Sequence, residues 1–299
     1  MIGIDPEKDL IGLAIQSHYF AVGSMALWAE PGVGAVIIQS IPKMAYDYGV
    51  AGLNLMRAGH SAATALQQLI AHDTRSDYRQ VAMVDTDAPP EVFTGESCVA
   101  EAGDVRGETF CCQANMMANP GVPEAMAKAF SSHTGEFPER LVAALKAAES
   151  KGGDLRGKQS AALIVVRRHP EGHHLADRPF DLRVDDHPEP LSELERLVEL
   201  KSAYHHSTRG DAALVREDFE EALREYQRSE EKSPGQTELY FWRALALLNT
   251  GRESDAIPLM KTLLKRDRKW FTLFERVAEA GLLEKDPELL ERLSKIAEE

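Results

Sequence analysis

The chain has 299 residues, of which 43% are hydrophobic and 27% charged, a composition typical of a globular protein with a sizeable core. Its formal net charge of −14 argues against nucleic-acid binding, because an acidic surface repels phosphate backbones. The sequence indicates a cytoplasmic protein without a membrane segment. Its apolar runs are too short to cross a bilayer, it lacks a secretory signal pattern, and its three cysteines have neither disulfide nor zinc spacing.

The first residues predict a β-hairpin. Met1–Ile4 and Leu10–Gln16 read as strands, and the polar segment Asp5–Asp9 reads as the turn between them. A hairpin folds its far end back beside its near end. We therefore expect the polar residues at and after the end of the second strand, Gln16, Ser17 and His18, to lie next to the start of the chain.

Short buried strands and pairs of amphipathic helices follow each other up to about residue 190. The further strands are predicted at Gly32–Gln39, Gln80–Asp85, Glu108–Gln113 and Ser160–Arg167. The helices are predicted at Tyr48–Arg57, Ala62–Ala71, Glu124–Phe130 and Pro138–Ser150. Clustering of like elements favours an α+β fold with largely antiparallel sheets. No glycine-rich phosphate loop is present.

The density of charge changes along the chain. Residues 1–196 hold 44 charged side chains, whereas the last 103 residues hold 38 and read as wholly helical. A helix is predicted over Pro190–His206, with a boundary near Thr208–Gly210. We therefore expect two domains, residues 1–206 and residues 207–299.

The second domain contains a repeat with a period of 34 residues. Ala222 recurs as Ala256 and Tyr226 as Met260, and Gly251 falls in the expected turn between paired helices. This period is typical of tetratricopeptide repeats, although a helical bundle with the same spacing by coincidence is an alternative. The expected core positions of the repeat are Trp242, Leu245, Leu248, Leu259 and Leu263.

Five ordered segments of the first domain resemble a known family. They are Gly12–Ser24, Pro31–Ser40, Arg79–Asp85, Gly152–Val166 and Asp181–Pro190. Together they resemble the uncharacterised bacterial family called domain of unknown function 1028, which is grouped with the N-terminal-nucleophile (Ntn) hydrolases. The resemblance implies a four-layer αββα sandwich and carries no known substrate.

The resemblance also implies a mechanism. In Ntn hydrolases the first residue of the mature chain is a Thr, Ser or Cys, whose own α-amino group acts as the base in the attack on an amide carbonyl. Met1 matches a position inside the first strand, so the nucleophile is expected upstream of Met1. Three alternatives stay open: a true start farther upstream, lost catalysis on a retained fold, or chemistry that never needed this nucleophile.

Five polar residues are the candidates for the site. Ser17, Gln39 and Asn115 come at the ends of buried strands, and Asn115 could donate its amide to an oxyanion. Asp154 and Arg156 lie in the segment GGDLRGKQS, where paired glycines permit an unusual backbone path and the planar fork of the arginine suits a substrate carboxylate. The alternative is that these residues only cap strands and lock a loop.

No metal or cofactor is predicted. Asp185, Asp186 and His187, with His173, His174 and Asp177 upstream, offer oxygen and nitrogen donors, but their spacing matches no established metal motif. The simpler interpretation is that Asp186 or His187 begins the following helix.

The sequence thus predicts an Ntn-type hydrolase that cleaves a C–N amide bond in a small molecule or peptide. The alternative is a non-catalytic protein that binds such a ligand and recruits a protein partner through residues 207–299. A homo-oligomeric scaffold is a third alternative.

Overall fold

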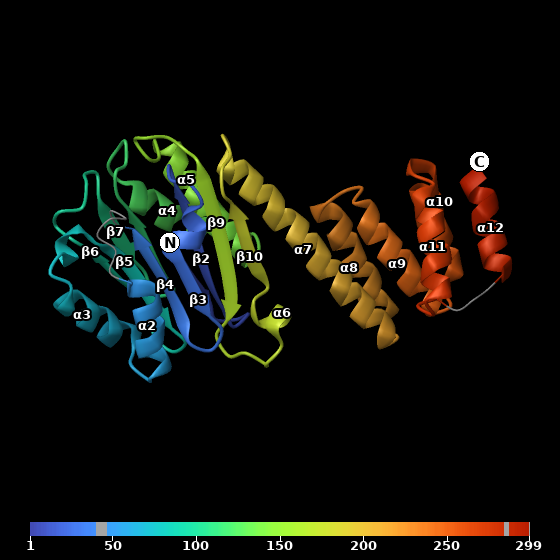
Figure 1. Cartoon of the computed structure of the whole chain (residues 1–299), viewed down its shortest axis with the longest axis horizontal. Helices are drawn as coiled ribbons and strands as arrows, with labels where there is room; N and C mark the ends of the chain where they lie inside the picture. The colour runs from blue at the N-terminus through green and yellow to red at the C-terminus, as the bar shows by residue number, and fades with distance from the viewer. Residues whose placement is uncertain (40–46, 284–286, 299) are drawn as a thin grey trace. The chain divides into compact units, whose positions relative to one another are not determined.

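The computed structural model describes residues 1–39, 47–283 and 287–298 (Figure 1). The chain is α+β and forms two compact units, Met1–Val198 and Glu199–Glu299. The described part of the chain contains no helix that is both long enough and apolar enough to cross a membrane.

Helix α7 (Pro190–Val215) begins in the first unit and ends in the second. The predicted helix end at His206 is wrong, and the helix continues through the segment Thr208–Gly210. Gly210 lies inside the helix, where a Cβ atom would lie 2.6 Å from the ring of Tyr226, so a glycine allows this close packing. The predicted domain boundary after residue 206 therefore falls inside a helix.

The first unit contains a six-stranded sheet in the order β10-β9-β2-β1-β8-β7, with every neighbouring pair antiparallel. Its strands are β1 (Ile2–Asp5), β2 (Leu10–Ser17), β7 (Gly103–Arg106), β8 (Phe110–Ala114), β9 (Ser160–Arg167) and β10 (Phe180–Val184). The hairpin of β1 and β2 is confirmed, with Ile2 opposite Leu13. The edge strands β7 and β10 have few buried positions, which explains why the sequence pattern did not predict them.

A second sheet has four antiparallel strands in the order β3-β4-β5-β6. They are β3 (Leu27–Glu30), β4 (Gly34–Gln39), β5 (Gln80–Asp85) and β6 (Glu91–Thr94). The two sheets face each other across an apolar core. Ile11 and Leu13 contribute from one sheet, and Ile37 and Val84 contribute from the other, together with the short helix α1 (Val22–Ala26).

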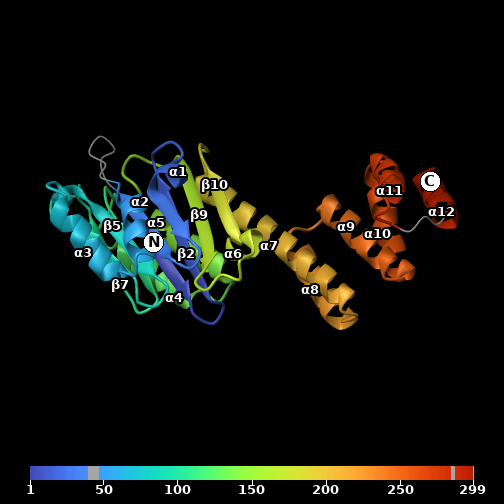
Figure 2. The same ribbon diagram turned by 60° about the horizontal axis from the view of Figure 1, so that its bottom comes forward.

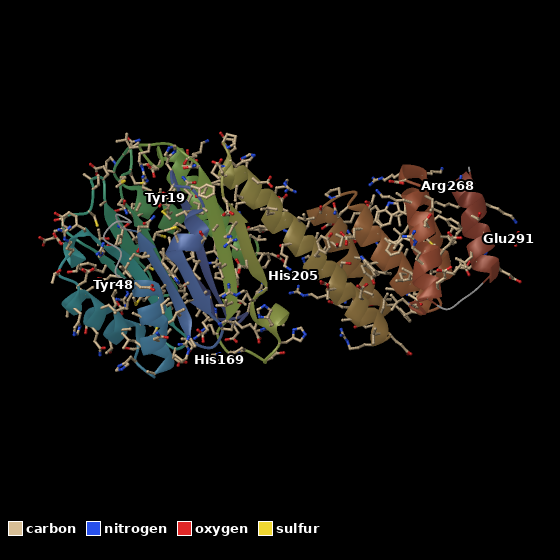
Figure 3. All side chains as sticks on the ribbon, viewed as in Figure 1. Tyr19, Tyr48, His169, His205, Arg268 and Glu291 are labelled. Carbon is tan, nitrogen blue, oxygen red and sulfur yellow. The ribbon has the colours of Figure 1, made fainter. Side chains whose placement is uncertain are left out.

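Helices cover the outer face of each sheet (Figure 2). Helices α2 (Tyr48–Arg57) and α3 (Ala62–His72) pack on β4 and β5, while α4 (Val122–Ser132), α5 (Phe137–Ser150) and the first turns of α7 pack on the six-stranded sheet. Cys111 faces the core between the sheets and Cys112 faces the helices, as adjacent strand residues must. Tyr48 is buried at the start of α2 and donates a hydrogen bond to Asp73 (Figure 3).

The second unit consists of helices. After α7 come α8 (Phe219–Lys232), α9 (Thr237–Asn249), α10 (Glu253–Arg266), α11 (Lys269–Glu279) and α12 (Pro287–Glu298). The two pairs of residues that are 34 apart, Ala222 with Ala256 and Tyr226 with Met260, are all buried at matching places in α8 and α10. Gly251 has a φ of +73° in the turn between α9 and α10, a conformation that favours glycine.

The predicted core position of Trp242 is wrong, because its side chain is 41% exposed. The neighbouring Phe241 is fully buried instead, with its ring centroid 5.4 Å from that of Trp270 and 4.6 Å from that of Phe274. Leu245 and Leu263 are buried as predicted. The core face of α9 is therefore rotated by one residue from the predicted face at this point.

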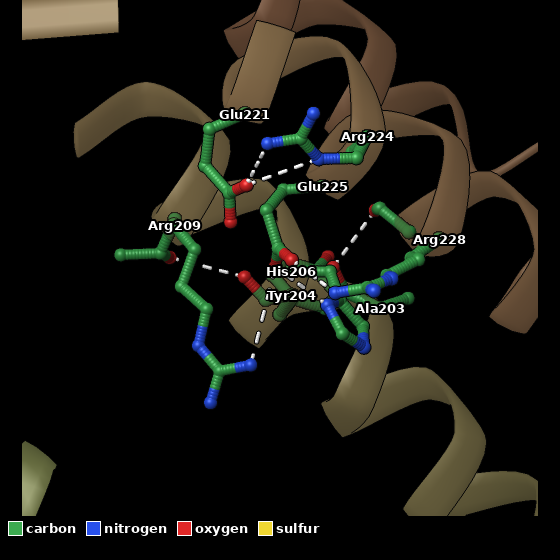
Figure 4. A network of polar contacts seen from close by, with 10 residues as sticks. Ala203, Tyr204, His206, Arg209, Glu221, Arg224, Glu225 and Arg228 are labelled. Carbon is green, nitrogen blue, oxygen red and sulfur yellow. Dashed lines mark hydrogen bonds and ion pairs between the residues drawn. The ribbon is translucent and has the colours of Figure 1, made fainter. Parts of the chain in front are cut away.

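The core of the second unit also holds a buried, hydrogen-bonded histidine and glutamate (Figure 4). Nδ1 of His206 lies 2.8 Å from Oε2 of Glu225, and both side chains are less than 5% exposed. Arg228 donates to the other carboxylate oxygen at 2.6 Å. Burial acts to raise the pKa of Glu225, but the contacts with His206 and Arg228 outweigh it and lower that pKa.

Candidate functional site

A cavity of about 690 Å³ lies within the first unit, where β2 and β4 end. Its polar wall consists of Gln16, Ser17, Tyr19, Ser24, Gln39, Asp47, Tyr78, Ser97, Asn115, Asp154 and Arg156. Its apolar wall consists of Val22, Met25, Ala26, Trp28, Ile38, Cys98, Val99, Met116 and Met117. All five predicted site residues line this one cavity, although they come from separate parts of the chain.

Asp154 and Arg156 form a bidentate ion pair at the cavity wall. Nε of Arg156 donates to Oδ1 at 3.0 Å and Nη2 donates to Oδ2 at 2.7 Å. The backbone N–H groups of Arg156 and His18 donate to the same carboxylate at 2.9 and 3.3 Å. Burial favours a higher pKa for Asp154, but the guanidinium and these donors outweigh it and hold the pKa below its ordinary value. The carboxylate therefore stays charged and fixes the plane of the guanidinium.

The two glycines before this pair provide the unusual backbone path that the sequence predicted. Gly152 and Gly153 have φ values of +120° and +60°. Ala118 donates its N–H to the Gly153 carbonyl at 2.9 Å, and Leu155 donates to the Met116 carbonyl at 2.9 Å. These bonds join the loop after α5 to the segment after β8, and so bring Asp154 to the cavity.

Ser17 ends β2 on the face that points between the sheets. Nη2 of Arg156 lies 3.4 Å from its hydroxyl oxygen, a long hydrogen bond across 139 residues of sequence. Its cross-strand neighbour Ser160 is fully buried. The Ser160 hydroxyl donates to the Tyr19 carbonyl at 2.5 Å and accepts from the Val22 N–H at 3.1 Å. Ser160, for which no separate role was predicted, thus holds the wall segment that carries Tyr19, labelled in Figure 3.

Asn115 lies at the end of β8 and contacts the other sheet. Its Nδ2 donates to Oε1 of Gln80 at 2.9 Å, and Gln80 is fully buried at the start of β5. Sequence reasoning missed Gln80, because a single glutamine at the start of a strand reads as a polar strand end. Gln39 ends β4, and its buried Oε1 has no hydrogen-bond partner among the described residues.

The start of the chain lies beside β2, but not beside Ser17. The Met1 amino group donates to the Ala14 carbonyl at 2.8 Å, and the Ala14 N–H donates back to Met1 at 3.1 Å. The prediction that His18 and Ser17 neighbour Met1 is therefore wrong, since the register leaves Met1 three positions short of Ser17. The Met1 side chain packs toward the helices, and burial lowers the pKa of its amino group.

The carboxylates and imidazoles near residue 186 make loop and helix-start contacts. Asp186 accepts a hydrogen bond from Gln159 at 3.2 Å, Nδ1 of His187 accepts one from the Glu189 N–H at 3.0 Å, and Asp177 accepts one from the Glu171 N–H at 2.9 Å. Within residues 1–39, 47–283 and 287–298, no group of three or more metal-ligating side chains comes together.

The model of a family of unknown function, DUF1028, matches residues 1–194. The chain belongs to the DUF1028 family. The crystal structure of the DUF1028 protein SPO2555 from Silicibacter pomeroyi is similar to this chain, with 30% sequence identity and a TM-score of 0.59. That likeness covers 66% of this DUF1028 chain and 83% of the other chain. A tetratricopeptide repeat model matches residues 207–269, and no curated protein matches.

Proposed function

We propose that this DUF1028 protein is an Ntn-type hydrolase, which cleaves a C–N amide bond in a small molecule or peptide. Its layers support the proposal: helices α2 and α3, the four-stranded sheet, the six-stranded sheet, and then helices α4 and α5. This order corresponds to the αββα sandwich expected of Ntn hydrolases. The cavity lies where the ends of strands from both sheets meet, a place where polar groups can act on one ligand.

The observation that carries the proposal is the register of β1 with its two neighbours. Ile2 lies opposite Leu13 of β2 and opposite Cys111 of β8. If both registers continued backward, the third residue before Met1 would stand between Ser17 and Asn115, two residues of the cavity wall. Its side chain would lie on the same face as Ile2, between the sheets. A Thr, Ser or Cys at the start of such an extension would present its hydroxyl or thiol to the cavity.

The wall residues then have chemical roles. The nucleophile oxygen or sulfur attacks the amide carbonyl carbon while its proton passes to the free α-amino group of the same residue. An Nδ2 hydrogen of Asn115 can stabilise the negative oxygen that forms on the carbonyl. The amino group returns the proton to the leaving nitrogen, and water then hydrolyses the acyl-enzyme. In this proposal Ser17 and Gln39 line the site beside the substrate, and Arg156 binds the substrate and holds it in place.

The test combines the native N-terminus with two matched chains. Intact-mass analysis of the protein from its own cells identifies its first residue. Recombinant chains that carry Thr-Phe-Ser or Ala-Phe-Ser before Met1, each with a free first residue, are then assayed on N-acylated amino acids and dipeptides. We expect the threonine chain to release amine at least about 1000-fold faster than the alanine chain. Equal rates in the two chains, or a native protein that begins at Met1, would refute the proposal.

A second candidate is a protein that binds its ligand without cleaving it. It is favoured by the ion pair of Asp154 and Arg156, which can hold a ligand at the cavity wall without any nucleophile. The tetratricopeptide match over residues 207–269 then indicates a surface for a protein partner. This candidate predicts that a chain lacking residues 216–299 keeps its small-molecule ligand and loses its protein partner in co-purification. Loss of the small-molecule ligand from that truncated chain would contradict it.

A further inference from the structure

We infer that the cavity is built for an amide that carries a free carboxylate on one side and an apolar or aromatic acyl group on the other, as in an N-acylated amino acid. The inference deepens the proposed hydrolase by naming its substrate class. The binding step it describes does not depend on catalysis, so the two can fail separately.

The carboxylate would bind the outer edge of Arg156. Nε and one hydrogen of Nη2 are used by Asp154, while the two hydrogens of Nη1 have no partner among the described residues. The Arg156 side chain is 43% exposed at the cavity wall. Asp154 holds the guanidinium plane rigid, so a ligand carboxylate meets donors already in position. The Ser17 hydroxyl, near Nη2, offers a further donor to the same group.

The apolar arm would bind the apolar side chains that line the same cavity. Trp28 comes from β3 of the four-stranded sheet, and Met25 and Met116 come from the segments before β3 and after β8. Met25 is 51% exposed, so a large apolar side chain faces solvent at the cavity wall. Thioethers and aromatic rings adapt to acyl groups of varied shape. The cavity volume of about 690 Å³ is also in the range of sites for small organic molecules.

The negative charges in the wall are compatible with an anionic ligand. Asp154 is compensated by Arg156 and by two backbone N–H donors. Asp47 begins α2 on the four-stranded sheet side, where it accepts the Val50 N–H at 3.1 Å and benefits from the positive end of the helix dipole. Neither carboxylate competes with the ligand for the Nη1 edge.

The experiment measures binding by titration calorimetry with three probes. These are N-benzoylglycine, its uncharged analogue N-benzoylglycinamide, and N-acetylglycine, which lacks the aromatic arm. We expect N-benzoylglycine to bind about tenfold to a hundredfold more tightly than the glycinamide, as for a charge-assisted hydrogen-bonded pair. N-acetylglycine should bind at least about tenfold more weakly than N-benzoylglycine, because it buries less apolar area.

Two variants assign these preferences to residues. Arg156→Gln should bind the two benzoyl probes equally, and Met25→Gln should reduce the preference for benzoyl over acetyl while keeping the preference for the carboxylate. Arg106→Gln is the matched control, because Arg106 is also paired to a carboxylate, that of Glu91, is 45% exposed, and lies outside the cavity wall. It should behave like the parent chain.

The inference is overturned if the parent chain binds the two benzoyl probes equally, binds neither at millimolar concentration, or keeps its carboxylate preference in Arg156→Gln. A circular dichroism spectrum of Arg156→Gln that matches the parent excludes misfolding as the cause of lost binding. Tight, Arg156-dependent binding without hydrolysis would support the inference and count against the proposed function alone.

Discussion

Asn115 and Gln80 join the two sheets of the first unit through a hydrogen bond of 2.9 Å, from Nδ2 of Asn115 to Oε1 of Gln80. Gln80 belongs to the four-stranded sheet, and its Nε2 also lies 3.0 Å from the Ala114 carbonyl and 3.2 Å from the Gly103 carbonyl of the six-stranded sheet. One buried amide therefore fixes the distance between the sheets beside the cavity.

Replacing this amide should destabilise the first unit. Gln80→Leu fills similar space but leaves buried carbonyl groups without a donor, so we expect the free energy of unfolding to fall by about 2–4 kcal/mol. Urea unfolding measures the change. Gln67→Leu, at an exposed position of α3, is the control and should cost less than about 0.5 kcal/mol. Equal effects of the two substitutions would show that Gln80 does not join the sheets.

Asp154 should stabilise the fold in a pH-dependent way. Its pKa in the folded protein is lowered, so its contribution is present above its unfolded value near 3.8 and disappears as the pH falls through the folded value. Asp154→Asn should therefore reduce the free energy of unfolding by about 1–3 kcal/mol near neutral pH and by progressively less below about pH 4. Urea unfolding as a function of pH tests this.

The matched control for Asp154 is Asp181→Asn. Asp181 also pairs with an arginine, Arg178, but it is 46% exposed, so its loss should cost less than about 1 kcal/mol. A cost of Asp154→Asn that stayed constant from acid to neutral pH would contradict the role given to its charge.

Glu225 should stabilise the second unit in the same pH-dependent way. Its pKa is lowered by His206 and Arg228 against the effect of burial, so its contribution is present above about pH 4.5 and is lost as the pH falls through the folded value. Glu225→Gln should cost about 1–3 kcal/mol near neutral pH, measured by urea unfolding with circular dichroism. Glu221→Gln, one turn earlier and paired with Arg224 at the surface, should cost less than about 1 kcal/mol. A larger loss at Glu221 would rule out this account.

Two adjacent aromatic residues of α9 should contribute very differently to the stability of the second unit. Phe241 is fully buried among Trp270 and Phe274, so Phe241→Ala should lower the free energy of unfolding by about 3–5 kcal/mol. Trp242 is 41% exposed, and Trp242→Ala should cost less than about 1.5 kcal/mol. Thermal unfolding measures the loss of stability in each variant. A larger loss for Trp242→Ala than for Phe241→Ala would support the core face that the sequence predicted.

Much of the architecture followed from local patterns. Short apolar strands such as Ser160–Arg167 and capped amphipathic helices such as Ala62–His72 are specified by the residues they contain. The α+β class, the helical second part and the 34-residue repeat were predicted on that basis. The family resemblance rested likewise on ordered segments of sequence, and the family match over residues 1–194 confirms it.

The sequence by itself determined most helices and the buried strands, because hydrophobic periodicity and capping act over a few neighbouring residues, but it missed β7, β10 and the true end of α7. Only tertiary structure decided that Arg156 meets Ser17, that Gln80 joins two sheets, and that Phe241 rather than Trp242 is buried. These contacts depend on strand register and on packing between elements far apart in sequence. The hydrophobic pattern of a strand sets which of its side chains face the core, but which strand it pairs with is decided only when the elements pack together.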